Sequence, residues 1–259
     1  MVGTDTPVVE ARDLVLRFGG LTVLSNVSFS VQPGELFAVI GPNGAGKSST
    51  FNCINGVYRP QQGDIRLEGQ SILGKKPYRI AQLGVARTFQ NLGLFMSLDI
   101  VENLMLGRHN LMRTGFLTGM GWVGRAKADE VANRRHVEEI IDLLALDEFR
   151  GRPVGLLPYG VQKRLELGRA LTMQPKLLLL DEPVAGMNLQ ETEDMARYIL
   201  EVQRELHLAM ILVEHDMHMV MDLANRVLVL DFGVPIATGT PREVQSNEAV
   251  IAAYLGQAS

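Results

Sequence analysis

The chain has 259 residues, of which 46% are hydrophobic, and it carries a formal net charge of −4 with a mean hydropathy of +0.09. This length suits one large α/β domain or a core with a smaller lobe, and the negative charge gives no reason to expect nucleic-acid binding, which usually needs a basic surface. Cys53 is the single cysteine, which excludes an internal disulfide and fits a reducing cytoplasm.

From the sequence we expect neither a leader nor a membrane span. The opening stretch MVGTDTPVVEARDL lacks the basic segment and apolar core of a signal peptide. No apolar run approaches the ~18 residues that a spanning helix needs. We therefore expect a soluble chain, or one that is at most peripheral to a membrane.

The first 40 residues predict three strands, at residues 8–18, 27–31 and 36–40, with turns at Gly19-Gly20 and Pro33-Gly34. Phe18 stands at the end of the first strand, just before the glycine pair. Its position in the sequence does not show whether the ring stacks on a nucleobase or packs in the core.

The run GPNGAGKS, residues 41–48, connects the third strand to a helix that begins near Lys47. Strand, glycine-rich turn and helix are the context in which GxxxxGK(S/T) forms a phosphate-binding loop. Its glycines let the backbone wrap closely and aim N–H groups inward, and the helix adds the positive end of its dipole. Lys47 is expected to reach the β- and γ-phosphates and the Ser48 hydroxyl to ligate Mg²⁺. The run therefore predicts a nucleoside triphosphate site, against the alternative of a flexible loop that binds nothing.

Short elements follow, with strands at residues 64–68 and 85–88 and helices at residues 77–83 and 99–106, the last with Asp99 as its cap. Gln90 comes just after the strand at residues 85–88. It is either an ordinary polar residue at a strand end or a group that reaches Mg²⁺ or the attacking water.

Residues 107–125, GRHNLMRTGFLTGMGWVGR, are rich in Gly, Leu and Met and hold the only Trp. This stretch either packs onto its own domain or contacts a membrane partner, since exposed apolar patches mark interfaces. A helix is predicted over residues 127–146. Residues 92–165 together form a mostly helical lobe inserted between strands of the core.

Two further segments carry candidate chemistry. Tyr159-Gly160 stands at the mouth of a helix over residues 161–173, where an anion could approach the N-terminus. The run KLLLLDEP predicts a buried parallel strand that ends at Asp181 and Glu182. Carboxylates at such strand ends lie at the ligand crevice of an open α/β sheet, although they could also cap the next helix.

The remaining elements are a helix at residues 190–206, a buried strand at residues 209–213, a hairpin of strands 226–231 and 234–238, and a terminal helical pair at residues 241–255. His215 follows the buried strand. It is a candidate phosphate sensor, with a structural histidine as the alternative.

Seven motifs resemble those of ABC ATPases, in the same order and over nearly the whole chain. They resemble the adenine-stacking loop, Walker A, Q-loop, signature, Walker B, D-loop and H-loop of that family, and in this order they are Phe18, GPNGAGKS, Gln90, LPYG, LLLLDEP, AGMN and His215. Five features resemble the branched-chain amino acid group of this family, and most closely its LivG-type subunits. They are the tyrosine before the signature glycine, AGMN, EHDM, the long insert and the ending VIAAYLG.

The resemblance implies an α/β fold of the P-loop NTPase class, with a RecA-like mixed sheet, an antiparallel β subdomain and an inserted helical subdomain. Within one ABC ATPase domain, residues 1–91 and 166–259 would form the catalytic core, residues 92–165 the helical subdomain, and residues 240–259 the C-terminal helices.

The resemblance also implies roles for individual residues. Glu182, His215 and Gln90 would be catalytic, and Mg²⁺ would be held by Ser48, Gln90 and Asp181. ATP would contact Phe18, Gly41, Pro42, Asn43, Gly44, Ala45, Gly46, Lys47, Ser48, Ser49, Tyr159 and Gly160.

Two motifs depart from the family pattern. The signature serine, which contacts the γ-phosphate across the dimer, is Pro158 here, with neither hydroxyl nor N–H, and the signature glutamine is Val161. Asn188 stands where the D-loop usually has Asp. The resemblance therefore implies that fewer groups than usual contact the γ-phosphate across the dimer.

The resemblance implies a second ATPase subunit as a partner, either identical (a homodimer) or LivF-like (a heterodimer). It also implies two permease chains and, as an indirect partner, an extracytoplasmic solute-binding protein. The chain would lie peripherally on the cytoplasmic face of the cell membrane.

The alternatives are an ABC ATPase for amide or urea uptake, for lipid export, or for a task on nucleic acid. A GTPase switch is disfavoured because no NKxD motif occurs, and a kinase would need a phosphate acceptor.

Overall fold

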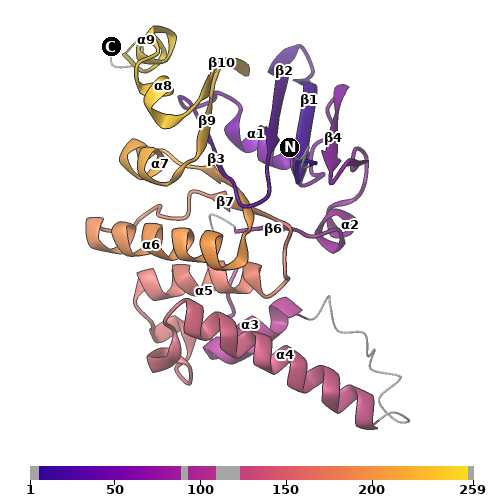
Figure 1. Cartoon of the computed structure of the whole chain (residues 1–259), viewed down its shortest axis with the longest axis vertical. Coiled ribbons are helices and arrows are strands. Elements are labelled where there is room, and N and C mark those ends of the chain that lie inside the picture. Colours follow the sequence, from indigo (N-terminus) through magenta and orange to yellow (C-terminus); the bar gives the residue numbers. More distant parts are fainter. Residues whose placement is uncertain (1–5, 89–92, 109–122, 256–259) are drawn as a thin grey trace, which may run out of the picture. The chain divides into compact units, whose positions relative to one another are not determined.

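The computed structural model describes residues 6–88, 93–108 and 123–255 (Figure 1). The chain divides into two compact units. The first comprises residues 1–87, 176–183 and 199–259, and the second comprises residues 88–175 and 184–198.

A six-stranded mixed sheet forms the centre of the first unit, in the order β10-β9-β3-β8-β7-β6. Its strands are β3 (Leu36–Ile40), β6 (Val85–Arg87), β7 (Leu177–Asp181), β8 (Ala209–Val213), β9 (Arg226–Asp231) and β10 (Val234–Gly239). β10 is antiparallel to β9, and the other pairs are parallel. Every residue of β3, β7 and β8 is buried, which explains their continuous apolar sequences.

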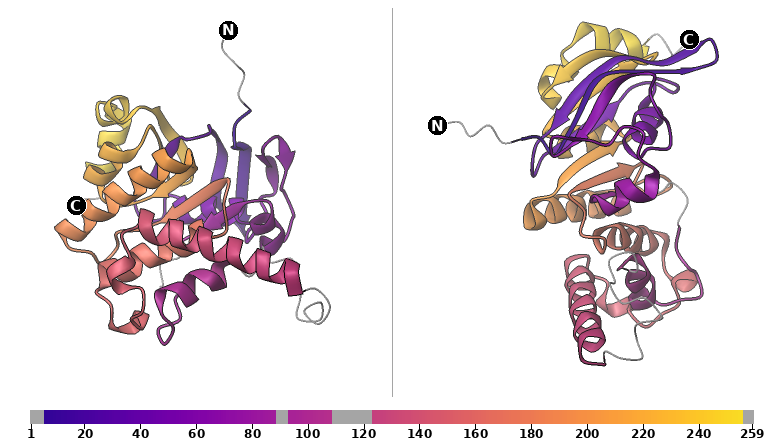
Figure 2. Two further views of the ribbon diagram at one scale, coloured as in Figure 1. Left: turned by 60° about the horizontal axis from the view of Figure 1, so that its bottom comes forward. Right: turned by 90° about the vertical axis from the view of Figure 1, so that its right-hand side faces the viewer.

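An antiparallel sheet lies beside it in the same unit, in the order β2-β1-β4-β5. Its strands are β1 (Val9–Phe18), β2 (Leu21–Val31), β4 (Gln62–Leu67) and β5 (Gln70–Ser71). Figure 2 shows the β1–β2 ribbon next to β10. The two sheets share one core, in which Phe29 stacks on Phe37 with ring centroids 5.3 Å apart. The expected mixed sheet and antiparallel sheet are both confirmed, and β2 is longer than the predicted strand at residues 27–31.

Helices complete the first unit: α1 (Lys47–Ile54), α2 (Pro77–Gln82), α7 (Met217–Leu223), α8 (Pro241–Gln245) and α9 (Glu248–Leu255), with residues 199–206 of α6 (Leu189–Leu206). The predicted terminal helical pair is present as α8 and α9. The described helices include none with the length and apolar character that a bilayer span requires.

The second unit is helical in the part of the chain that the structure describes. It holds α3 (Ile100–Arg108), α4 (Val123–Leu143), the short 3-10 helices η2 (Asp147–Phe149) and η3 (Val154–Leu156), α5 (Tyr159–Leu171) and residues 189–198 of α6. Asp99 caps α3 as expected, since its carboxylate accepts the N–H of Glu102 at 2.8 Å.

The boundary of this unit differs from the predicted one. We expected the core to resume at residue 166, in the middle of what is one continuous helix, α5. The buried Leu165 and Leu167 lie on this helix, which packs against α3 and α4. α5 therefore stays with the second unit as a whole, and residues 184–198 join it.

Arg108 joins three helices within the second unit. Its side chain is buried, and burial lowers its pKa. Its Nε donates to Asn133 Oδ1 on α4 at 2.5 Å, and its terminal nitrogen donates to the carbonyl of Thr172 at the end of α5 at 2.9 Å. Gly107 and Arg108 begin the Gly- and Met-rich stretch, and they pack within their own unit. Residues 109–122 of that stretch lie outside the described residues.

We expect Arg108→Met to lower the free energy of unfolding by about 3 kcal/mol, because a buried carbonyl and a buried amide would lose a charged donor. Urea unfolding measures this. Arg134→Met is the matched control, since Arg134 is an exposed arginine paired with Glu130 at 3.3 Å, and such surface pairs contribute less than about 1 kcal/mol. Equal losses in the two variants would contradict the structural role of Arg108.

Candidate functional site

The phosphate-binding loop predicted from the sequence connects the buried strand β3 to α1. A Cβ on Gly41 would lie 2.0 Å from the carbonyl oxygen of Leu230, and one on Gly46 would lie 2.8 Å from Leu24 Cδ2. Gly46 also has φ +104 and precedes the first residue of α1. Neither position accommodates a side chain, so the glycines are needed to hold the loop against its own unit.

Lys47 reaches back into the loop from the first position of α1. Its ammonium donates to the carbonyl oxygens of Gly41 at 2.6 Å and Pro42 at 3.0 Å. Burial lowers the pKa of Lys47, while the negative charge of Glu182 acts in the opposite direction. A cation at the N-terminus of a helix, surrounded by loop amides, is an arrangement that binds phosphate.

A cavity of about 340 Å³ opens over this loop. It is lined by Val23, Asn43, Gly44, Ala45, Gly46, Lys47, Ser48, Ser49, Glu182 and His215. Most predicted phosphate contacts are therefore brought together with two predicted catalytic residues. Sequence reasoning missed Val23, since nothing in its local pattern distinguishes it from other residues of β2.

Glu182 and His215 meet at the carboxyl ends of the neighbouring strands β7 and β8. The His215 Nε2 lies 2.9 Å from Glu182 Oε1. Glu182 adopts a left-handed backbone conformation, with φ 48, and its N–H donates to the Val213 carbonyl at 2.9 Å. Strained backbone of this kind is concentrated at functional sites.

Asp181 is buried at the end of β7 and pairs with Arg87 of β6, with 2.6 Å between a terminal guanidinium nitrogen and Oδ2. The other terminal nitrogen of Arg87 donates to Asn52 on α1 at 2.8 Å. Sequence reasoning missed Arg87. Nothing in the local sequence shows that the strand of Arg87 lies beside the strand that ends in Asp181.

The donors expected to hold Mg²⁺ fit that ion in their chemistry. The Ser48 hydroxyl and the Asp181 carboxylate are the hard oxygen ligands that Mg²⁺ prefers, and Asp181 already accepts a cationic partner. Within the described residues no group of three or more acidic, histidine or cysteine side chains could hold a metal by itself. Mg²⁺ typically binds through one or two carboxylates together with substrate phosphates. Gln90 lies outside the described residues.

Phe18 is half exposed at the end of β1, so it is not the core aromatic that one alternative proposed. Its ring makes an edge-on contact with Tyr58, with centroids 5.0 Å apart. Phe18 is not among the residues that line the cavity over the phosphate-binding loop. Its proposed contact with a base stays a prediction.

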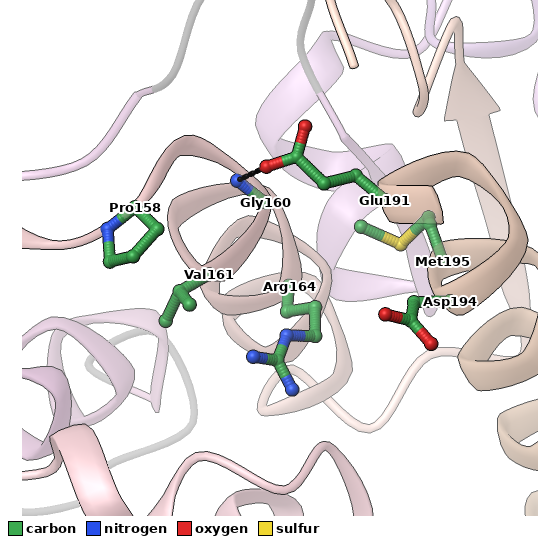
Figure 3. Close-up of a pocket in the computed structure, with 7 residues that line it drawn as sticks. All are labelled: Pro158, Gly160, Val161, Arg164, Glu191, Asp194 and Met195. Carbon is green, nitrogen blue, oxygen red and sulfur yellow. Dashed lines mark hydrogen bonds between the residues drawn. The ribbon is translucent and has the colours of Figure 1, made fainter. Parts of the chain in front are cut away.

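The N-terminus of α5 forms a separate cluster, within the second unit (Figure 3). Pro158 precedes this helix and supplies no side-chain cap. The Tyr159 hydroxyl donates to the Ala185 carbonyl at 3.0 Å, and the Gly160 N–H donates to Glu191 Oε1 at 3.3 Å. A cavity of about 130 Å³ lies here, lined by Pro158, Gly160, Val161, Arg164, Glu191, Asp194 and Met195.

Glu191 is a third residue that sequence reasoning missed. Its Oε2 accepts the N–H of Asn188 at 3.1 Å, while Asn188 Oδ1 accepts the N–H of Glu191 at 3.0 Å. This reciprocal pair is a capping box at the start of α6. The spacing Asn-x-x-Glu was a signal for the cap, but it did not indicate the bond to Gly160.

Residues 24–185 match the family model described as "ABC transporter", and residues 234–259 match the model described as "Branched-chain amino acid ATP-binding cassette transporter". The chain is 40% identical to the high-affinity branched-chain amino acid transport ATP-binding protein BraF of Pseudomonas aeruginosa and 38% identical to the corresponding protein LivG of Escherichia coli. Each alignment covers 97% of this chain and 99% of the relative.

Among solved structures, the ADP conformation of an ATP-binding cassette from an ABC transporter superimposes with a TM-score of 0.83 at 27% identity. The match covers 97% of this chain and 99% of that chain. The fold of the chain is therefore that of a nucleotide-binding cassette.

Proposed function

The chain belongs to the ATP-binding proteins of the ABC transporter family, and we propose that it couples ATP hydrolysis to the uptake of branched-chain amino acids. Membership of this family makes the chain a nucleotide-binding ATPase. The proposed cargo is supported by the printed functions of BraF and LivG, which match at 38–40% identity over nearly their full length. The C-terminal match to a branched-chain amino acid model supports the same cargo.

The observation that carries the mechanism is the cavity that unites the phosphate-binding loop with Glu182 and His215. Lys47 and the loop N–H groups would hold the β- and γ-phosphates, and Phe18 would stack on the adenine. Ser48 would hold Mg²⁺ together with Asp181 and Gln90. When bound, Mg²⁺ neutralises charge that develops on the phosphates.

In the hydrolytic step, Glu182 orients a water and accepts its proton. The water oxygen forms a bond to the γ-phosphorus, and the bond from that phosphorus to the bridging oxygen of ADP breaks. His215, with a proton on Nε2, donates to the Glu182 carboxylate across 2.9 Å and so keeps it aimed into the cavity. Once ATP is bound, this Nε2–H would be shared with an oxygen of the γ-phosphate.

The proposed assembly contains a second ATPase subunit, either identical or LivF-like, and two permease chains, with an extracytoplasmic solute-binding protein as an indirect partner. The chain would lie peripherally on the cytoplasmic face of the membrane. Tyr159 and Gly160 would close over the ATP of the second subunit, and the second unit would transmit that closure to the permease through the Gln90 segment.

Purification of the tagged chain from membranes, followed by reconstitution of the complex in vesicles, tests the cargo. We expect co-purified permease chains, and ATP hydrolysis that rises when a binding protein loaded with leucine, isoleucine or valine is added outside. The same complex without the binding protein is the control. Stimulation by amides, urea or lipid instead, or recovery with nucleic acid and no permease, would overturn the proposed cargo.

A further inference from the structure

We propose that Glu191 acts as an internal competitor for the N-terminus of α5. Its carboxylate holds the Gly160 N–H in the separated subunit, and the triphosphate of a second ATP-bound subunit must displace it. This inference rests on the proposed function, in which Tyr159 and Gly160 close over that triphosphate.

The Gly160 N–H needs an acceptor because its own helix provides none. The first N–H groups of a helix have no partner inside it, and a Ser, Thr, Asn or Asp just before the helix usually supplies one. Here that residue is Pro158, which makes no side-chain cap. Glu191 accepts this N–H from α6 instead, at 3.3 Å (Figure 3).

The approach of Glu191 depends on a glycine at position 160. A Cβ there would lie 3.0 Å from Glu191 Oε1 and 3.2 Å from its Cγ. Any other residue would therefore require the Glu191 side chain to shift by a few tenths of an ångström. The absence of a side chain at Gly160 serves the internal contact as well as the approach of a phosphate.

One further bond of Glu191 and one bond between neighbouring residues support this contact. Its second oxygen accepts the Asn188 N–H at 3.1 Å in the capping box of α6. The Tyr159 hydroxyl bonds to the Ala185 carbonyl at 3.0 Å, which ties the start of α5 to the segment that leads into α6. The carboxylate is thus directed at Gly160 by the structure around it rather than by a chance rotamer.

A carboxylate and a phosphate at the same donor exclude one another for two reasons. One N–H makes one good hydrogen bond, and like charges a few ångströms apart repel strongly where water is partly excluded. Closure of the second subunit must therefore displace the Glu191 carboxylate. At low ATP concentration, Glu191 keeps the separated subunits from closing.

The test uses Glu191→Gln in the full-length chain, in a Glu182→Gln background so that bound ATP is not hydrolysed. Glutamine keeps the size of the side chain and functions in a capping box, but it carries no charge. We expect the ATP concentration that drives half-maximal association with the second subunit to fall on the order of 10-fold, within the usual range of coupling between sites. Analytical ultracentrifugation over an ATP titration measures this.

Asp194→Asn in the same background is the matched control. Asp194 lies one turn further along α6 and lines the same cavity, but it bonds to Arg197 at 2.7 Å. The variant changes the net charge by the same amount and leaves Gly160 bound, so we expect the association midpoint to stay within about twofold. Equal midpoints for the two variants, or a higher midpoint for Glu191→Gln, would overturn the proposal.

Amide hydrogen exchange of the separated subunit tests the contact without a partner. The Gly160 amide should exchange faster in Glu191→Ala than in wild type, with no change in Asp194→Asn, and equal rates in all three would overturn the contact itself. A wild-type chain that binds ATP but never associates would instead overturn the proposed closure over a second subunit, and this inference with it.

Discussion

Glu182→Gln is expected to bind ATP with unchanged affinity and to hydrolyse it about 10²–10⁴-fold more slowly, the usual contribution of a general base. This loss corresponds to roughly 3–5 kcal/mol of activation free energy. Glutamine fills the same space beside His215 but cannot take a proton from water. Phosphate release in a single turnover by the assembled complex, together with equilibrium ATP binding, separates the two effects.

Glu214→Gln is the control for this variant. Glu214 also follows a strand of the central sheet, but its Oε2 accepts the N–H of His215 at 3.0 Å and it is not among the residues lining the cavity. We expect its hydrolysis rate to stay within about tenfold of wild type, below the range for loss of a general base. A Glu182→Gln protein with a near wild-type rate would show that another group activates the water.

Lys47→Ala is expected to weaken ATP binding by about 100-fold, because the variant loses a charge-assisted hydrogen bond of up to ~3 kcal/mol to phosphate. The Lys47 ammonium already lies inside the loop, 2.6 Å from the Gly41 carbonyl oxygen. A small shift of this side chain would exchange carbonyl oxygens for phosphate oxygens. Fluorescence titration with a labelled ATP analogue measures the affinity.

Lys176→Ala removes the same charge from an exposed position of the same unit, where Lys176 pairs with Glu68. We expect ATP affinity within about twofold of wild type, because screening by salt weakens the effect of a distant exposed charge. If the two lysine variants bound ATP equally well, the phosphate-binding role of Lys47 would be wrong.

Much of the fold could be predicted because its signals are local. β3, β7 and β8 are continuous apolar runs, and such runs are typical of parallel strands buried on both faces. The loop at residues 41–48 is one contiguous motif. The polar residues that follow the strands mark the carboxyl ends at which a ligand binds. The terminal helical pair carried its own capping signal, since Thr240 and Glu243 form a capping box at the start of α8.

The errors and omissions share a different cause. The predicted boundary at residue 165 lies inside α5, while the buried face of this helix assigns all of it to the second unit. Val23 lines the cavity over the phosphate-binding loop from β2, a strand that belongs to the other sheet of its unit. Neither the packing of α5 nor the contribution of Val23 to the cavity can be recognised from a few consecutive residues of sequence.

The sequence alone determined the class of the protein and its phosphate-binding loop motif, and it predicted roles for Lys47, Glu182 and His215, because each belongs to a short motif. Only the tertiary structure decided which distant side chains complete these groups. Arg87 reaches Asp181 because β6 and β7 are neighbours in the sheet although 94 residues separate the two side chains. Glu191 reaches Gly160 because two helix ends meet. Such contacts depend on strand order and helix packing, which minimise the free energy of the whole unit and are not written in any one segment.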